Sequence, residues 1–289
     1  MVTKITSYLT FMMVALSGFA QGEPLHWKAT KGDKELVILG SVHMGKKEMY
    51  PLPETILQSL QSSDALILEA DLNSASVSLP KSNELTSDYL SEKQKAELQK
   101  ISAEVGISEA FLLSQSPWRT ALILQLAYYS TLGYQEELGI DNYLANKARQ
   151  NTIPIKGLET VGYQLSLFSD SAEVGRDLLD DIINEWEKNK KISECLIDDW
   201  ISGDEDKLES LMYETSNSEE IIDLLIYNRN RNWAEKLDDS SFISKDGRYL
   251  VVVGALHLVG KDNLISLLKN RGFQIEQLSK SVKSDCHID

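Results

Sequence analysis

Residues 36–45, LVILGSVHMG, run through four apolar residues and then break into glycine, serine and, after one valine, histidine. Residues 250–260, LVVVGALHLVG, repeat this pattern near the other end of the chain. A short apolar run bounded by glycine is typical of a fully buried strand. The two stretches therefore predict two strands of one core sheet, each followed by Gly, a small residue, an apolar residue and His.

The segments around these two stretches predict the rest of an α/β fold. Residues 25–40 predict a hairpin, because two strand-like runs flank a Lys-Gly-Asp-Lys turn. Residues 51–63 and 64–72 then predict a helix and a second buried strand, which complete a strand–helix–strand unit. Residues 91–237 read mainly as helices, and residues 248–278 return to strand, helix and strand. We expect a central mixed β-sheet flanked by helices, with a large helical middle section packed over the sheet.

The N-terminal segment looks like a secretory signal peptide. Lys4 is the only charged residue before Glu23, and the apolar run between them ends in small residues. This composition predicts a signal peptide over residues 1–20 with cleavage after Ala20. The run is shorter than the roughly 20 residues of a spanning helix, so an uncleaved anchor is the weaker alternative. We therefore expect an exported protein, periplasmic or secreted, with no stable membrane association after cleavage.

The chain has 289 residues, of which 42% are hydrophobic, enough to bury a large core. No low-complexity linker interrupts it, and we expect a single domain over residues 23–289. The formal net charge of −15, from 29 basic and 44 acidic residues, disfavours binding to nucleic acid or to anionic membranes. A peptide or a small molecule is therefore the expected partner, whereas the sequence does not indicate an oligomeric state.

The chain has two cysteines, Cys195 and Cys286. In an exported protein they can form one disulfide, which would tie down the polar C-terminal tail. The alternative is two free thiols, with Cys195 buried as a small apolar residue. Two cysteines cannot make a thiolate cage for zinc, and no Gly-x-Ser-x-Gly, Walker A or His-Glu-x-x-His motif is present.

The histidines within the two opening stretches are candidate ligands. In a sheet covered by helices, ligands gather beyond the carboxyl ends of the strands. Gly40 and Gly254 allow a sharp turn or a close approach there, so that His43 and His257 can point into one crevice. Two imidazoles at one place are a typical start for a divalent metal site. A histidine after a glycine can equally be a hydrogen-bonded structural group.

Three acids also follow apolar or glycine-containing segments. Glu69 ends the strand-like run ALILE, Glu159 ends IPIKGLE, and Asp141 opens a predicted helix. Carboxylates accompany imidazoles at many metal sites, although a single acid at a strand end is more often a cap or an ion-pair partner. Residues 228–233, NRNRNW, add Arg and Asn to an amphipathic helix. They form a solvated face, or they supply an arginine that pairs with the acids of the site.

At these residues the sequence resembles the TraB/GumN family, which includes bacterial pheromone-shutdown proteins and is related to the TIKI metalloproteases of animals. The resemblance covers nearly all of the mature chain. It rests on LGSVHMG with ALILEADL, on GIDNYLANKARQNTIPIKGLETVGYQLSLF, on RNRNW and on VVVGALHLVGKDNLISLLKNRGFQIEQL. It implies a mixed sheet flanked by helices, with two Gly-x-x-His motifs and an acid at the site. In the TIKI branch these motifs carry metal-dependent peptidase activity, supported by manganese or cobalt.

The resemblance also assigns individual residues. It identifies the two motifs and the acid that follows the first of them: Gly40 with His43, Gly254 with His257, and Glu69. It places further residues at recurrent polar positions of the family: Asp141, Glu159, Gln164, Arg229 and Asn230.

These observations lead to the hypothesis of a divalent-metal-dependent hydrolase, in the first place a peptidase. The expected metal ligands are imidazoles and carboxylates: His43, His257, Glu69 and Asp141. Such a mixed set suits Mn, Co or Zn. The expected catalytic residues are Glu69 or Glu159 as the general base, and Arg229 to stabilise the developing oxyanion or to orient a carboxylate. The same crevice could instead belong to a non-catalytic binding protein for a peptide, haem or metal, or to an esterase that uses His and Glu without metal.

Overall fold

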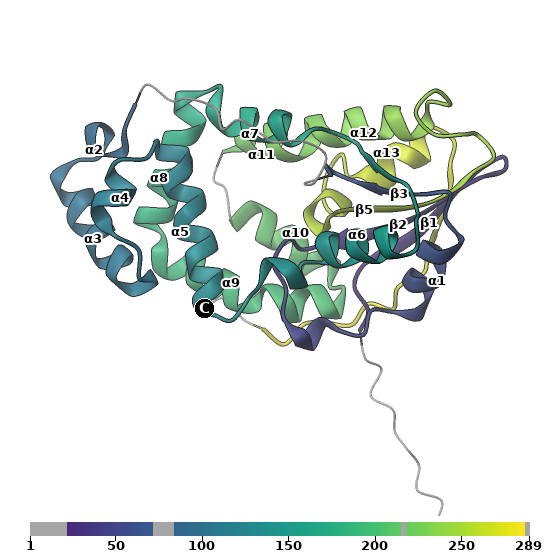
Figure 1. Ribbon diagram of the computed structural model, residues 1–289, viewed down its shortest axis with the longest axis horizontal. Helices are drawn as coiled ribbons and strands as arrows, with labels where there is room; N and C mark the ends of the chain where they lie inside the picture. The colour runs from purple at the N-terminus through teal and green to yellow at the C-terminus, as the bar shows by residue number, and fades with distance from the viewer. Residues whose placement is uncertain (1–21, 72–83, 215–217, 287–289) are drawn as a thin grey trace, which may run out of the picture.

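The computed structural model describes residues 22–71, 84–214 and 218–286 (Figure 1). The predicted signal peptide lies outside these residues. Within them, six strands form one sheet in the order β4-β3-β5-β2-β1-β6. The strands are β1 (His26–Lys31), β2 (Lys34–Ser41), β3 (Ala65–Leu68), β4 (Ile155–Gly157), β5 (Arg248–Gly254) and β6 (Gln274–Gln277).

The centre of the sheet is parallel and carries the two opening stretches of sequence. β2 and β5 pair in parallel, with Leu39 beside Val252 and Ser41 beside Gly254. β3 and β4 continue the parallel part, whereas β1 pairs antiparallel with both β2 and β6. Leu39 and Val252 are fully buried, as expected for strands covered on both faces. The prediction of a mixed sheet shared by the two ends of the chain is confirmed.

Helices cover both faces of the sheet (Figure 1). Helices α1 (Glu54–Ser62) and α6 (Ile140–Gln150) lie on one face, and α12 (Asn228–Asp238) and α13 (Leu264–Asn270) lie on the other. α1 begins directly after Pro53 and turns Ile56 and Leu60 inward, because residues four apart share one face of a helix. The fold is therefore of the α/β class that the sequence predicts.

A helical section lies beyond the carboxyl ends of the parallel strands (Figure 1). Its own core includes Leu98, Leu124 and Leu179, which are fully buried. The middle of the chain forms α2 (Thr86–Tyr89), α3 (Glu92–Val105), α4 (Glu109–Leu113), α5 (Pro117–Thr131), α7 (Val161–Ser169), α8 (Ala172–Asn184), α9 (Trp186–Ser202), α10 (Glu205–Glu214) and α11 (Glu219–Ile222). α9 fastens this section to the sheet, since Nε1 of Trp200 donates to the carbonyl of Gly40 at 2.9 Å. Among the described residues, no helix combines the length and the apolar character needed to cross a bilayer.

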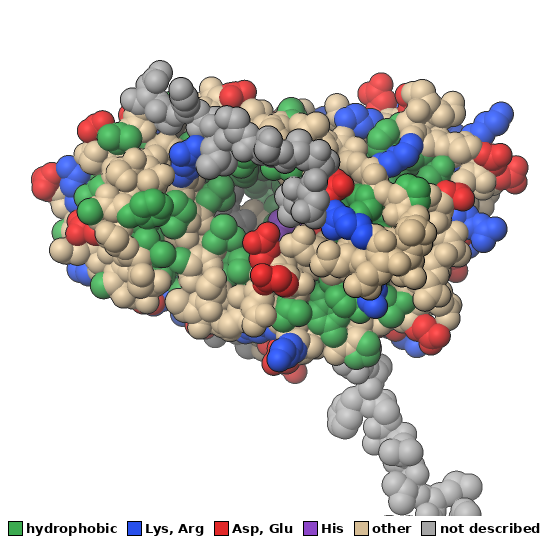
Figure 2. Space-filling view, viewed as in Figure 1, with side chains coloured by type: hydrophobic (Ala, Val, Ile, Leu, Met, Phe, Trp, Pro, Cys, Tyr) green, Lys and Arg blue, Asp and Glu red, His purple; other side chains and the backbone are tan. Residues whose placement is uncertain are grey.

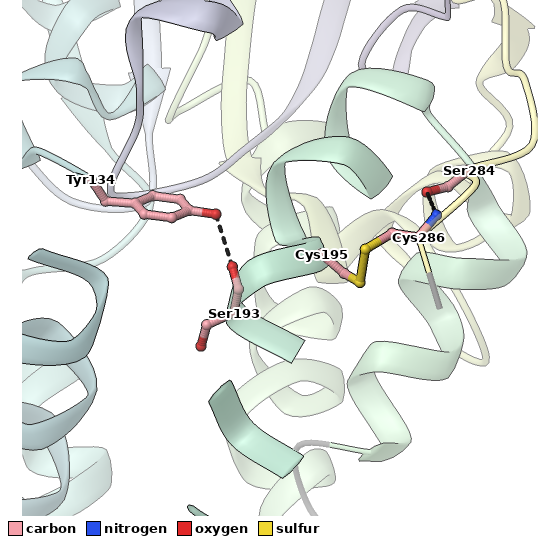
Figure 3. Close-up of a disulfide and its surroundings, with 5 residues drawn as sticks. All are labelled: Tyr134, Ser193, Cys195, Ser284 and Cys286. Carbon is pink, nitrogen blue, oxygen red and sulfur yellow. Dashed lines mark hydrogen bonds between the residues drawn. A yellow bond between two sulfur atoms is a disulfide. The ribbon is translucent and has the colours of Figure 1, made fainter. Parts of the chain in front are cut away.

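A disulfide joins Cys195 on α9 to Cys286 in the C-terminal tail (Figure 3). Of the two alternatives for the cysteines, the structure shows the disulfide. Two residues before Cys195, the carbonyl of Ser193 accepts a hydrogen bond of 2.9 Å from the hydroxyl of Tyr134. Because Tyr134 also lines a large pocket, α9 connects the disulfide to the wall of that pocket.

Candidate functional site

Four strand ends bring candidate site residues to one edge of the sheet. His43 lies two residues beyond β2, Glu69 follows β3 directly, and Glu159 lies two residues beyond β4. His257 lies in η4 (Ala255–Leu258), the short turn after β5. Because these four strands are parallel neighbours, all four side chains start from the same edge.

The two glycines of the motifs act through close approach. A Cβ on Gly40 would lie 3.1 Å from the Cα of Ala255, so its absence lets β2 lie against the turn after β5. A Cβ on Gly254 would lie 3.2 Å from Oε1 of Glu69, and the N–H of Gly254 donates to the same oxygen at 2.7 Å. Neither glycine has a positive φ, so the structure supports close approach rather than a sharp turn.

Arg229, near the start of α12, lies at the centre of the site. Its Nη2 donates to Oε2 of Glu69 at 2.5 Å and to Oε2 of Glu159 at 3.0 Å. Its Nη1 donates to Nε2 of His257 at 3.2 Å and to the carbonyl of Leu225 at 2.9 Å. The buried guanidinium compensates two carboxylates that would be costly to bury alone. Of the two interpretations of NRNRNW, pairing with the acids therefore applies to Arg229.

Glu69 is ionised although it is buried. Its Oε2 accepts a second hydrogen bond of 3.0 Å from Nε2 of Gln164. Burial alone would raise the pKa of Glu69, but the positive charge of Arg229 and the hydrogen bond from the N–H of Gly254 outweigh burial and hold the pKa well below its usual range. The carboxylate is therefore negatively charged at neutral pH.

Asn230 fixes the protonation of His257. Its amide NH₂ donates to the carbonyls of His257 and Asp262 at 3.3 and 3.0 Å. Its Oδ1 therefore accepts the hydrogen bond of 2.7 Å from Nδ1 of His257. The lone pair of Nε2 accepts from Arg229 and lies 3.7 Å from Oε1 of Glu69. Burial lowers the pKa of His257 to about 3, so the imidazole is neutral at neutral pH.

His43 belongs to a separate pair. Its Nδ1 lies 3.0 Å from Oδ2 of Asp141, whose Oδ1 accepts from the Ser41 hydroxyl at 3.0 Å. Asp141 lies in the first turn of α6, where the helix N-terminus favours a carboxylate. The Asp141 carboxylate raises the pKa of His43 to about 9, so the two groups form an ion pair at neutral pH. The His43 side chain is 67% exposed, and solvent screening weakens this ion pair.

A pocket of about 780 Å³ opens beside these groups, and Figure 2 shows the hollow with a histidine visible inside it. His43, Glu69, Asp141 and Arg229 line its side toward the sheet, and α5 and α7 line the opposite side. His257 contacts Arg229 from the protein interior and does not line the pocket. The two imidazoles therefore share one edge of the sheet but belong to different hydrogen-bonded groups.

The donor types of the site suit a divalent cation, but the Arg229 guanidinium stands between them. Nε2 of His257 and Oε1 of Glu69 are 3.7 Å apart. Two ligands that each lie about 2.1 Å from one ion have a similar separation. In the described part of the chain, however, no three His, Cys, Asp or Glu side chains gather closely enough to hold an ion. Metal binding at this point would require Arg229 to release Glu69 and His257.

Trp233 and Ser41 are residues of the site that the sequence analysis did not single out. Nε1 of Trp233 donates to Oε1 of Glu159 at 2.8 Å, and the ring centroids of Trp233 and His257 lie 4.3 Å apart. Trp233 follows Arg229 by four residues, so both lie on one face of α12. That spacing within RNRNW was the signal for Trp233, whereas a serine after a strand glycine gives no comparable signal.

The fold and the site define an α/β protein in which a buried arginine links two carboxylates and a histidine beside an open pocket. The chain belongs to the TraB/PrgY/gumN family, whose model matches residues 25–277. Two relatives, the uncharacterized protein YbaP of Escherichia coli strain K12 and that of Shigella flexneri, are each 32% identical to it over 268 residues. The match covers 90% of this chain and 99% of each relative. No solved structure matches the chain significantly.

Proposed function

We propose that the chain is an exported hydrolase that cleaves peptide bonds with the help of a divalent metal ion. The observation that carries this proposal is the buried pair of His257 and Glu69 beside an open pocket. The lone pair of a neutral imidazole and an ionised carboxylate oxygen are donors that catalytic metal sites use. The pocket volume also lies within the range of roughly 300–1,000 Å³ that is typical of ligand sites.

In this proposal, one set of residues binds the metal ion and Arg229 stabilises the oxyanion. The residues that would hold Mn, Co or Zn, after Arg229 had released Glu69 and His257 and the donors had moved together, are imidazoles and carboxylates: His43, His257, Glu69 and Asp141. A bound ion of this kind supplies polarisation of the scissile carbonyl and a lowered pKa for water. Arg229 lines the pocket, and the N–H groups that it would release from Glu69 and His257 would donate to the oxyanion that develops on a carbonyl there.

The two candidate general bases differ in their access to the pocket. Glu159 does not line the pocket, and its carboxylate accepts hydrogen bonds from Arg229 and Trp233. We therefore assign Glu159 to positioning Arg229. Glu69 does line the pocket, so of the two acids it is the one that can meet a water molecule there; it would act as the base only if the other donors hold the ion, and otherwise it is a ligand.

Metal-free ester hydrolysis in the same pocket is a second candidate, and the pair of His43 and Asp141 favours it. Asp141 holds the imidazole through Nδ1, and Nε2–H of the protonated ring would donate to a substrate oxygen at neutral pH. Hydrolases that work without metal use a carboxylate to orient a catalytic histidine in this way. A non-catalytic binding protein for a peptide, haem or metal would use the same pocket without turnover.

A peptide-library digest separates these candidates. The mature protein, beginning at Gln21, is incubated with the library after chelation and again after addition of Mn, Co or Zn. We expect cleavage with metal present, and a loss of more than about 100-fold in the variants His43→Ala and His257→Ala. His26→Gln is the control, since Nδ1 of His26 bonds the carbonyl of Pro24 away from the pocket. Cleavage that survives chelation contradicts the metal-dependent proposal, and binding without cleavage favours the binding protein.

We propose that this activity takes place in the periplasm or outside the cell. The disulfide between Cys195 and Cys286 supports this location, because such bonds persist in oxidising compartments. Cell fractionation of the full chain is expected to place it in the exported fraction. Cys195 and Cys286 are expected to be joined in the disulfide there and therefore not to react with a thiol reagent. A variant that lacks residues 2–20 is expected to stay in the cytoplasm. Recovery of the full chain from the cytoplasm would contradict the location.

A further inference from the structure

The pocket has an apolar wall that no other part of the described chain fills. On α5, Leu122 and Leu126 are four residues apart and face the pocket together. On α7, Val161, Leu165 and Phe168 form a similar stripe. Leu126 is 50% exposed, which is unusual for a leucine within a large helical section. Apolar side chains on two helices that face one pocket indicate a ligand with an apolar part.

The charges that line the pocket are unbalanced. Carboxylates outnumber cations by four to two even when His43 is protonated, since the ionisable lining consists of Glu69, Glu136, Glu137, Asp141, His43 and Arg229. Glu69 pairs with Arg229, and Asp141 pairs with His43. The surplus therefore belongs to Glu136 and Glu137, which lie exposed in η2 (Glu136–Leu138). Figure 2 shows acidic side chains gathered at the edge of the hollow.

We infer that the substrate is an oligopeptide in which an apolar residue stands next to a basic residue. The inference rests on the proposed peptidase function and names its substrate class. The apolar side chain would lie between α5 and α7, because burial there removes the exposed Leu126 and the partly exposed Phe168 from water. The basic side chain would lie near Glu136 and Glu137, where the surplus negative charge attracts a cation. Acidic peptides would be repelled by the same carboxylates.

Peptide binding to the metal-free protein tests this inference independently of catalysis. The probes are three N-acetylated, C-amidated hexapeptides that differ in one residue after a central leucine, which is Lys, Gln or Glu, and that carry a fluorophore for anisotropy. We expect the lysine peptide to bind about three- to tenfold more tightly than the glutamine peptide, as for one or two exposed ion pairs. We expect the glutamate peptide to bind most weakly, and we expect high salt to remove these differences.

Two pairs of variants decide the outcome. Glu136→Gln with Glu137→Gln is expected to abolish the preference for lysine, whereas Glu235→Gln with Glu276→Gln changes the net charge equally at exposed positions outside the pocket and should preserve it. Leu126→Gln is expected to weaken binding of all three peptides. A preference that survives in the first double variant, or equal binding of the three peptides to the wild type, overturns the inference. Absence of cleavage after metal addition, with the preference intact, would instead contradict the peptidase proposal.

Discussion

Arg229 connects three ionisable groups of the site through one side chain: Glu69, Glu159 and His257. A planar guanidinium with five N–H donors can contact several acceptors at once, which the compact ammonium of a lysine cannot reproduce. The residue also stacks on its neighbour along α12, with its guanidinium carbon 4.6 Å from the ring centroid of Trp233. Arg229 therefore sets the charge balance of the site as well as its geometry.

Loss of this arginine is expected to destabilise the fold. Arg229→Met leaves the carboxylates of Glu69 and Glu159 buried without a counter-charge, which should lower the free energy of unfolding by about 3–5 kcal/mol. Arg231→Met is the matched control, because the ion pairs of Arg231 are partly exposed and should contribute at most about 1 kcal/mol. Urea unfolding followed by circular dichroism measures both. Equal losses in the two variants would contradict the central role of Arg229.

The raised pKa of His43 gives a pH dependence with a defined sign. The ion pair with Asp141 contributes its full stability below the unfolded-state pKa of about 6.5. That contribution is lost as the pH rises through the folded-state pKa of about 9. NMR titration of the imidazole in metal-free protein should show His43 titrating well above 6.5, and Asp141→Asn should return its pKa toward 6.5. The same pKa in both proteins would show that Asp141 does not hold His43.

His257 is expected to behave in the opposite way. Burial lowers its pKa to about 3, so the folded state resists protonation while the unfolded state takes up a proton below about pH 6.5. The contribution of His257 to the free energy of unfolding therefore decreases as the pH falls below that value. Its NMR signals should stay those of the neutral Nδ1–H tautomer down to about pH 5, and protonation at pH 6 would contradict the hydrogen bonds assigned to Asn230.

At the scale of elements, the disulfide between α9 and the C-terminal tail is expected to raise the free energy of unfolding. It spans 91 residues, and closure of a loop of that length in the unfolded chain is worth about 4–5 kcal/mol. The variant Cys195→Ser with Cys286→Ser should lose about that much free energy of unfolding. Dithiothreitol should destabilise the wild type and leave this variant unaffected. An equal effect of dithiothreitol on both proteins would show that the reductant does not act through the disulfide between Cys195 and Cys286.

The strands and longer helices were predictable because their signals are local. The apolar runs bounded by Gly40 and Gly254 became β2 and β5. Helix α3 begins after the cap Ser91 and ends at Gly106, which has a positive φ, as its sequence indicates. Helices α2 and α4 did not stand out, because runs of four and five residues are too short to show a helical period.

The side-chain network was less predictable because it depends on tertiary packing. The sequence indicates that His43 and His257 follow two strands of one sheet, and the structure pairs these strands and places both residues at one edge of the sheet. Their partners come from distant helices, however, with Asp141 on α6 and Asn230 on α12. No local pattern specifies which face of α12 turns Arg229 toward the acids. The two imidazoles therefore have separate partners that spacing along the chain could not reveal.

At the scale of the whole molecule, the pocket depends on both parts of the fold. The sheet supplies one side with His43 and Glu69, and the helical section supplies the other with α5 and α7. The pocket therefore depends on the packing of the helical section against the sheet, and Figure 1 shows how these two parts are arranged. The formal net charge of −15 is in keeping with the surplus of carboxylates around the pocket, and both favour approach of a cationic ligand.

Metal content of the purified mature protein tests the central claim most directly. Elemental analysis is performed after incubation with Mn, Co or Zn and removal of free ions, on the wild type beside His43→Ala, His257→Ala and His26→Gln. The account predicts about one ion per chain in the wild type and in the His26 control, because a single site of mixed ligands is proposed. It predicts loss of the ion in both other variants. No bound ion in the wild type, or unchanged binding in His43→Ala and His257→Ala, would contradict the account.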